Sequence, residues 1–436
     1  MKHNDITDET PCSGPVDLWS QADRRGFLQA GMGGFLSLFF AQWLGSAQGV
    51  AAQAKGVRPK SCILLWMNGG PSHLETFDPK PGTPTRGSAS AIKTRAAGIQ
   101  IAAGFAQVAE VADKMAIVRG MTSKEGSHQR AQYLMHTGYA PNPTIAHPSL
   151  GAWVNKELGA ASAELPNFVS ISGPSMGAGF LGVQYAPFVV QNPNQSPQNI
   201  AYARNVNAER FDTRMNGLNF LEQGFQNETQ DNKVKGHREV YGKAVRMMRS
   251  PRLKAFDIKE EPTAVQQAYG NSNFGRGCLM ARRLVESGVR FVEVVQDGWD
   301  THNDNFNRTG KLIANVDPAM ATLIKDLAER DMLDSTLILW MGEFGRTPRI
   351  NANEGRDHYP QAWNMALAGG GVRAGIAYGA TDETGAKVVD KPILVPDLFA
   401  TVATLLGMKP DKSLVSPIGR PIAITEKGKV VQELIA

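Results

Sequence analysis

Carboxylate, imidazole and amide side chains recur directly after apolar segments of strand length in this chain of 436 residues. Such groups occupy 68–78, 297–304 and Glu343, and a further pair, Asp357 and His358, lies in a later loop. Zinc and the harder divalent cations need ligands that converge from several segments, because one strand end cannot surround an ion. We therefore expect a divalent metal site for zinc, calcium, magnesium or manganese. The candidate ligands are Asn68, His73, Asp297, Asp300, His302, Glu343, Asp357 and His358.

Arginines lie in the same kind of polar or glycine-rich loop. Arg130, Arg346 and Arg356 are the examples, and a planar guanidinium suits a sulfate, a phosphate or a carboxylate. For each arginine alone, an ordinary surface position is an equally good interpretation. We expect Arg130 and Arg346 to help bind an anionic substrate.

Strand and helix patterns alternate along the chain and place the polar groups at strand ends. Predicted strands occupy 61–67, 115–119, 167–172, 289–295 and 335–341, and predicted helices occupy 105–114, 317–331 and 397–406. This alternation indicates an α/β fold, with a doubly wound, mostly parallel sheet and helices on both faces. Ligands of such sheets bind beyond the carboxyl ends of the strands. Residues 196–288 have amphipathic helical spacing, and we expect them to form a helical insertion or cap.

The first 54 residues have the features of an export signal. Arg24 and Arg25 precede an apolar, glycine-containing run, and Ala-Gln-Ala at 52–54 offers a cleavage site. The pattern predicts a twin-arginine signal peptide over 1–54, one α/β domain over 55–436, and a periplasmic or extracellular location. A transmembrane anchor is the alternative. We expect no stable membrane span, because the run is short and interrupted by glycines.

Composition excludes few functions. An apolar content of 42% and a charged content of 20% are ordinary for a globular protein, and a net charge of +5 is small for this length. We see no dense basic block with interleaved aromatic residues, so no nucleic-acid partner is expected. Cys62 and Cys278 lie in apolar segments and are expected to be buried and unpaired.

Two short motifs suggest other chemistry. Residues 173–177 match G-x-S-x-G, which would make Ser175 the nucleophile of a serine esterase. That motif requires a helix directly after the serine, whereas a glycine-rich stretch follows here. Residues 177–182 also match G-x-G-x-x-G, but they lack the helix and acidic residue of a dinucleotide site. The esterase remains a minor alternative, and no nucleotide cofactor is expected.

Several motifs, in their order along the chain, resemble domain-of-unknown-function family 1501 (DUF1501). Besides the twin-arginine start, the matching segments are 64–78, 298–302 (GWDTH), 342–348 (GEFGRTP), 355–358 (GRDH) and 375–385. That family is grouped with the alkaline phosphatase-like superfamily, which includes sulfatases and metal-dependent phosphomutases. Residues 130–138 are similar to the sulfatase segment that ends in Leu-Thr-Gly after the nucleophile, and 397–407 are similar to the C-terminal helix of sulfatases.

The resemblance implies roles for individual residues. Asp300 and His302 would form one metal site together with His358. Glu343 would take the place of the acidic ligand after the penultimate core strand. Asn68 would stand where a catalytic relative has an aspartate, so one ligand would be neutral.

By the same resemblance, the nucleophile position of a sulfatase falls on His128, with Ser127 adjacent. The nucleophile is therefore displaced, replaced by water, or lost. The expected function is that of an exported metal-dependent hydrolase acting on sulfate or phosphate esters of small molecules or glycans. The alternative is a non-catalytic secreted protein that binds a metal together with a carbohydrate or another partner. The oligomeric state is left open.

Overall fold

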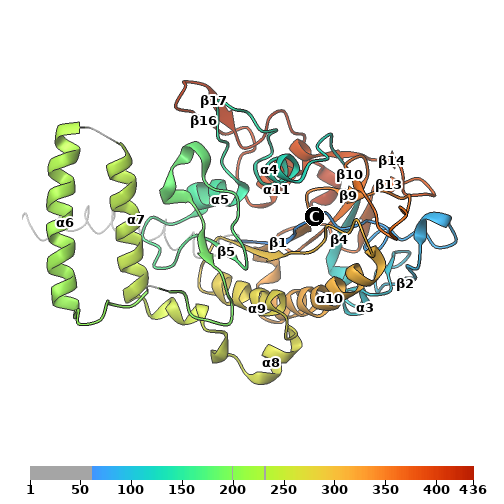
Figure 1. The fold of residues 1–436 in the computed structure, drawn as a ribbon, viewed down its shortest axis with the longest axis horizontal. Coiled ribbons are helices and arrows are strands. Elements are labelled where there is room, and N and C mark those ends of the chain that lie inside the picture. Colours follow the sequence, from blue (N-terminus) through green and yellow to red (C-terminus); the bar gives the residue numbers. More distant parts are fainter. Residues whose placement is uncertain (1–60, 199, 230–231) are drawn as a thin grey trace, which may run out of the picture. The chain divides into compact units, whose positions relative to one another are not determined.

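A nine-stranded sheet forms the centre of the computed structural model, which describes residues 61–198, 200–229 and 232–436 (Figure 1). Eight strands follow the order β12, β4, β11, β8, β1, β7, β5, β6, and β15 pairs with β4. Their bounds are β1 Ser61–Met67, β4 Met115–Thr122, β5 Phe168–Ile171, β6 Phe188–Val190, β7 Phe291–Gln296, β8 Thr336–Met341, β11 Trp363–Ala368, β12 Ile376–Tyr378 and β15 Ile393–Leu394. Only the pairings of β11 within this sheet are antiparallel. The predicted mostly parallel α/β sheet is confirmed, whereas the signal-peptide prediction for 1–54 lies outside the described residues.

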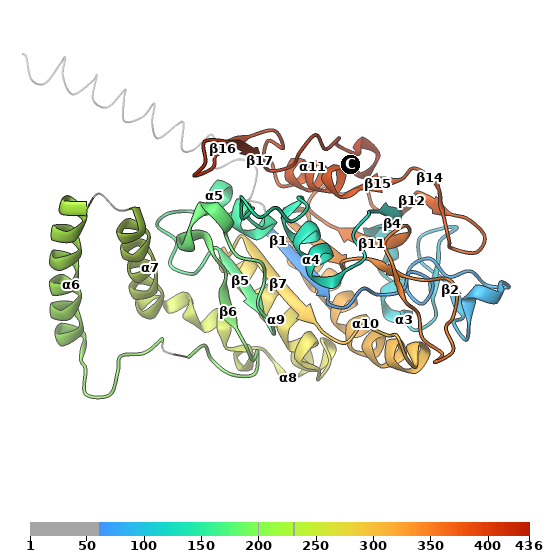
Figure 2. The same ribbon diagram turned by 45° about the horizontal axis from the view of Figure 1, so that its top comes forward.

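Helices cover both faces of the sheet (Figures 1 and 2). One layer contains α3 Ala106–Ala109, α9 Asn273–Glu286 and α10 Asn305–Glu329, and the other contains α4 His128–Thr137, α5 Leu150–Leu158 and α11 Val395–Leu405. Along β1, Ile63 and Leu65 pack into the first layer, and Leu64 and Trp66 into the second. The alternation follows from the two-residue period of a strand. A strand buried on both faces is a continuous apolar run, which is why β1 was predictable.

The segment predicted as one helical insertion, 196–288, contains two different parts. Helices α6 Ala208–Thr229 and α7 Asn232–Arg249 form a hairpin beside the sheet, and α8 Thr263–Ala268 follows (Figures 1 and 2). Helix α9 instead belongs to the core, where Cys278 and Leu279 are fully buried. Both described cysteines, Cys62 and Cys278, are buried and free. No helix among the described residues is both long and apolar enough to cross a membrane.

Helix α10 begins well before the predicted start at Asp317. An acidic residue followed by proline resembles a helix start, but Pro318 lies inside α10. The carboxylate of Asp317 accepts hydrogen bonds from the backbone N–H groups of Gln107 and Val108, at 3.0 and 2.8 Å. Asp317 therefore provides hydrogen-bond acceptors for free backbone N–H groups in the first turn of α3, rather than capping its own helix.

Short strand pairs lie outside the main sheet. They are β2 Ala91–Lys93 with β3 Gln100–Ala102, β9 Gly345–Arg346 with β10 His358–Tyr359, β13 Ala380–Thr381 with β14 Val388–Asp390, and β16 Ser413–Val415 with β17 Pro421–Ala423. The β9–β10 pair matters for function because it sets His358 opposite Arg346. Two loops that carry polar motifs are thereby held together beyond β8.

Candidate metal centre

The loops that follow β1 and β7 cross each other at the carboxyl ends of these strands. The backbone N–H of Trp299 donates to the carbonyl oxygen of Asn68 at 3.1 Å. Gly69 has a φ of +117°, and a Cβ there would lie 2.3 Å from the backbone nitrogen of Asp300. Only glycine allows this close approach. The tight crossing fixes the backbone of Asp300 against the turn after β1.

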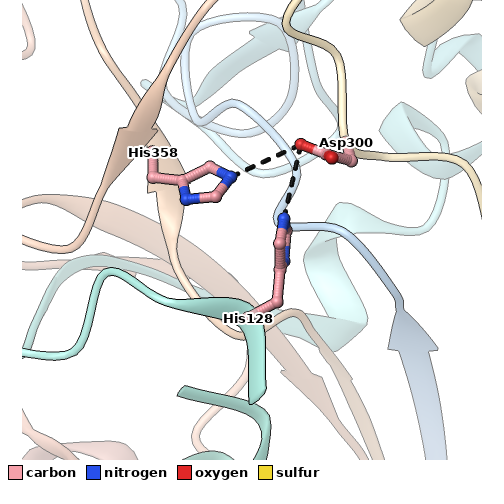
Figure 3. Close-up of side chains that lie close together, drawn as sticks. All are labelled: His128, Asp300 and His358. Carbon is pink, nitrogen blue, oxygen red and sulfur yellow. Dashed lines mark ion pairs between the residues drawn. The ribbon is translucent and has the colours of Figure 1, made fainter. Parts of the chain in front are cut away.

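Three imidazole rings surround the carboxylate of Asp300. Nε2 of His128, from α4, lies 3.4 Å from Asp300 Oδ1, and Nε2 of His358, from β10, lies 3.5 Å from the same oxygen (Figure 3). His302, from the loop after β7, brings its Nε2 to 3.1 Å from that oxygen and to 3.0 Å from Nε2 of His358. Three separate segments thus direct one ring nitrogen each toward a single carboxylate oxygen.

The other nitrogen of each ring, Nδ1, faces a hydrogen-bond acceptor. The pairs are His128 with Glu343 at 2.8 Å, His302 with Asp357 at 2.9 Å, and His358 with the carbonyl oxygen of Gly126 at 2.8 Å. Carboxylate and carbonyl oxygens only accept, so each Nδ1 carries a proton and each neutral ring keeps its lone pair on Nε2. Metal-binding histidines in proteins are held in this way.

The three Nε2 lone pairs fit a metal ion. If both rings are neutral with Nδ1 protonated, the Nε2 lone pairs of His302 and His358 meet at 3.0 Å, an arrangement that a shared cation would stabilise, and Nε2 of His128 is buried without a hydrogen bond. Tetrahedral ligands about 2.0–2.1 Å from zinc lie about 3.3–3.4 Å from one another, close to the 3.1–3.5 Å from Asp300 Oδ1 to each Nε2 and the 3.0 Å between His302 and His358. One ligand atom each from His128, Asp300 and His358 lies within 4.8 Å of the other two. Three imidazoles and one carboxylate suit zinc or another transition ion better than calcium or magnesium, which prefer oxygen ligands.

The surrounding charges favour an ionised carboxylate in this cluster. Burial by itself would raise the pKa of Asp300, but the hydrogen bond and charge of Arg346 and the nearby His128 and His302 lower it to about 2. The hydrogen bond to Glu343 raises the pKa of His128 above the ordinary histidine value. Burial lowers the pKa of His358, and the charge of Arg346 adds to that effect. The lowered pKa favours the neutral form of the His358 ring.

Glu343, predicted as a ligand, lies behind His128. Its carboxylate is fully buried, accepts from Nδ1 of His128, and receives the backbone N–H of Gly69 at 3.0 and 3.2 Å. The structure places Asp357 in the same kind of position behind His302. Both carboxylates orient imidazole rings through Nδ1 rather than joining the group around Asp300 Oδ1.

The guanidinium of Arg346 is buried and already bonded. It donates to the carbonyl oxygens of Gly69, Gly70 and Arg356 and to Asp300 Oδ1, the last at 2.6 Å. These hydrogen bonds connect the loop after β1, the loop after β7 and the segment before β10. Arg130 is exposed and pairs with both oxygens of Glu125, each at 2.7 Å.

The remaining predicted residues lie outside the cluster. The side-chain NH2 of Asn68 donates to Asp297 at 2.6 Å, and its side-chain oxygen accepts from Gln132 at 2.7 Å, so both ends of the amide are hydrogen-bonded. His73 is buried with Nε2 against the carbonyl oxygen of Gly385 at 2.8 Å, and burial lowers its pKa. Ser127 is exposed at the start of α4, next to His128.

Gln132 was missed from the sequence. It links Asn68 to the region of Glu343, whose Oε1 lies 3.5 Å from its Nε2. The available signal was spacing: His128, Gln132 and His136 recur every four residues, which puts them on one face of a helix. His128 itself was identified only as the position of a nucleophile.

Ser175, the candidate esterase nucleophile, hydrogen-bonds to the buried carboxylate of Glu293. The other oxygen of Glu293 lies 3.1 Å from Nε2 of His136. Burial alone would lower the pKa of His136, but the charge and hydrogen bond of Glu293 raise it. Ser175 and His136 are therefore each engaged by Glu293, and none of the hydrogen bonds among the described residues joins the serine to a histidine.

Ser175→Ala is accordingly expected to leave hydrolysis of any ester substrate within about twofold of wild type. It removes one donor from a buried carboxylate, which costs about 1–3 kcal/mol of unfolding free energy. Initial rates on aryl esters and denaturant titration measure the two effects. Loss of esterase activity in a folded Ser175→Ala variant would instead support the serine mechanism.

Comparison with known proteins places the chain in a family. A search of curated protein sequences found no match. Among solved structures, Ps i-CgsB is similar over 81% of this chain and 73% of its own, with 13% identity and a TM-score of 0.41. The PsFucS1 sulfatase from Pseudoalteromonas sp. is similar over 84% and 70%, with 12% identity and a TM-score of 0.37. The C-terminal periplasmic domain of EcEptC from Escherichia coli is similar over 84% and 88%, with 9% identity and a TM-score of 0.36.

The family model described as "Protein of unknown function (DUF1501)" matches residues 59–435. This range includes every candidate ligand in the cluster and the whole central sheet. The predicted resemblance to this family is confirmed, and the chain belongs to the DUF1501 family.

Proposed function

We propose that the protein is a metal-dependent hydrolase of alkaline phosphatase-like type that acts on sulfate or phosphate esters. The observation that carries the proposal is the convergence of three Nε2 lone pairs on Asp300 Oδ1, with every Nδ1 held by an acceptor. His128, Asp300, His302 and His358 would hold the ion. A divalent cation at such a site polarises an ester oxygen and lowers the pKa of water.

The chain's own residues would bind the ion and keep the site rigid. Glu343 and Asp357 hydrogen-bond to two of the imidazole rings, and Arg346 donates a hydrogen bond to Asp300. The side chains of His128, Asp300 and His302 are 29%, 48% and 39% exposed, so an ester can reach them from solvent. Such preorganisation means that little rearrangement is needed when charge develops on the ester.

Water is the nucleophile in this proposal. Among the hydrogen bonds of the described residues, none joins a serine or threonine hydroxyl to the side chains of His128, Asp300, His302 or His358. Direct attack by water on sulfur or phosphorus breaks the ester bond and gives the free anion and an alcohol.

A chelator test separates this proposal from a non-catalytic metal-binding protein. Turnover of aryl sulfates and aryl phosphates should be lost in EDTA and restored by one divalent cation. Stoichiometric metal without turnover on any ester of the panel would favour the binding protein. Turnover that persists in EDTA, with no metal present, would refute metal dependence.

Metal affinity is expected to rise with pH over the range that contains the raised pKa of His128, above the ordinary histidine value of about 6.5. Because the pKa of His128 is raised, its Nε2 in the metal-free protein still carries a proton where an ordinary histidine is neutral. The ion must displace that proton, so affinity increases as the pH passes through the raised pKa and levels off above it. Calorimetry in two buffers with different ionisation heats measures the proton release. Affinity and proton release that do not vary over this range would contradict the assignment of His128.

We also propose that residues 1–54 direct export and that 55–436 form the exported domain. The support is the Arg24-Arg25 pair followed by an apolar run and the Ala-Gln-Ala site. The twin-arginine pathway carries folded proteins, which suits a protein that acquires a metal before export. Replacing both arginines with lysine should retain the protein inside the cell.

A further inference from the structure

A cleft of about 630 Å³ lies between α5, α7 and the short helix η5, Val183–Tyr185. Helix α7 lies between α6 and the main sheet in both ribbon views (Figures 1 and 2). Hydrogen bonds fix α7 here: Nζ of Lys243 donates to the carbonyl oxygen of Gln184 at 2.5 Å, and Arg246 donates to that of Ala161 at 3.2 Å. The cleft is therefore built by the fold, and it is separate from the residues of the metal centre.

We propose that this cleft binds a segment of an anionic polysaccharide, whose sulfate or carboxylate groups it recognises through a cluster of lysines and arginines. The cationic lining residues are Lys156, Lys235, Arg238, Lys243 and Arg246. Glu239 is the one acidic residue among the lining side chains, so the cleft has a net charge of five minus one, or +4. The net charge of the whole chain is only +5. This concentration of charge in one cleft is a strong attraction for a polyanion.

The cations of the cleft contact neutral groups. Lys156 donates to the hydroxyl of Tyr185 at 3.4 Å, and Arg238 donates to Gln226 at 3.3 Å. Among the ion pairs of the described residues, none includes any of the five cations. Like charges held side by side repel each other, and a bound polyanion would remove that repulsion.

Tyr185 holds two of the ammonium groups in place. Nζ of Lys156 and Nζ of Lys243 lie 4.9 and 5.6 Å from the centre of its ring. Burial lowers the pKa of Lys243; the charge of Glu239 opposes this shift, and the charge of Arg246 adds to it. A partly desolvated ammonium interacts more strongly with an incoming anion than a fully hydrated one. Lys243 is thus the centre of the proposed site.

The lining favours a polysaccharide over a nucleic acid or a membrane surface. Tyr185 is the only aromatic residue of the lining, and two lysine ammonium groups lie near its ring, so the lining offers no series of aromatic rings on which successive bases could stack. The exposed Asn219 provides an amide group that matches sugar hydroxyls between the charged substituents. A concave site does not suit the flat headgroup layer of a membrane.

The inference does not depend on the proposed hydrolysis, because none of the lining residues belongs to the metal centre. A polymer held here would be retained by the protein whether or not its esters are cleaved. Binding should therefore persist in an Asp300→Asn variant, which separates failure of this proposal from failure of the proposed function.

The test is binding of a fluorescent heparin hexasaccharide to the full chain, measured by anisotropy. We expect saturable binding that weakens as salt is raised, and at least about tenfold weaker binding by Lys243→Gln/Arg246→Gln. Lys93→Gln/Lys311→Gln is the matched control, because it removes two exposed charges elsewhere and should bind as wild type. Equal loss in both double variants, or no loss in the first, would overturn the site.

Two further probes test the class of ligand. Desulfated hexasaccharide should bind at least about tenfold more weakly, and single-stranded DNA of equal charge or anionic lipid vesicles should not compete. Tighter binding of DNA or vesicles would overturn the polysaccharide assignment. If the double variant does not fold, protection of Lys156 and Lys243 from acetylation by the hexasaccharide in the wild-type protein decides the question, and unprotected lysines refute the site.

Discussion

Asp300→Asn is expected to abolish stoichiometric metal binding, with a loss of affinity of at least about 100-fold, and to abolish metal-dependent turnover. Oδ1 of Asp300 is the one atom that contacts Nε2 of all three histidines. An amide at this position provides no negative charge to balance a divalent cation. Elemental analysis and calorimetric titration of the purified variant measure the change.

Asp297→Asn is the matched control for that experiment. Asp297 is an exposed carboxylate of the same loop, three residues before Asp300, and its side chain contacts the amide of Asn68. Its replacement should leave metal content unchanged. If Asp300→Asn keeps a full equivalent of metal while Asp297→Asn loses it, the cluster has been assigned to the wrong carboxylate.

Glu343→Gln is expected to weaken metal binding by about 10–100-fold, the usual effect of removing a residue that orients a ligand. A neutral amide no longer raises the pKa of His128 and can turn its NH2 group toward the ring, which reverses the polarity at Nδ1. The same change disturbs the hydrogen bonds from Gly69, so the unfolding free energy should fall by about 1–3 kcal/mol. Calorimetry at several pH values measures the metal affinity, and denaturant titration measures the free energy of unfolding.

Glu293→Gln separates the effect on the metal from the effect on stability. Glu293 is also buried and also hydrogen-bonded to a histidine, His136, but that pair lies outside the metal centre. We expect a comparable loss of stability with unchanged metal affinity. Equal losses of affinity in the two variants would mean that Glu343 acts only through the stability of the fold.

The central strands could be predicted because they are buried on both faces. Ser61–Met67 was predicted with its exact bounds, and Thr336–Met341 within one residue. Strand β11, Trp363–Ala368, was not identified, and its antiparallel direction between β4 and β8 depends on contacts between distant segments. The start of α10 was misplaced because Asp317 caps a different helix, which local sequence does not reveal.

The residue types of the site could be predicted, but which of them would surround Asp300 Oδ1 and which would hold the far side of an imidazole could not. Asp300, His302 and His358 follow strands or lie in glycine-rich loops, and the structure brings their side chains together. Residue type alone does not tell whether a carboxylate such as Glu343 would contact a metal or the far side of an imidazole. That distinction depends on distances of about 3 Å within the folded protein.

The most direct test of the metal centre is a crystal structure of the full protein with an anomalous difference map at the absorption edge of its bound metal. We expect one peak among Nε2 of His128, His302 and His358 and Oδ1 of Asp300, at about 2.0–2.2 Å from its ligands if the metal is zinc. A metal peak elsewhere in the chain, or a metal-free protein that still hydrolyses esters, would contradict the assignment.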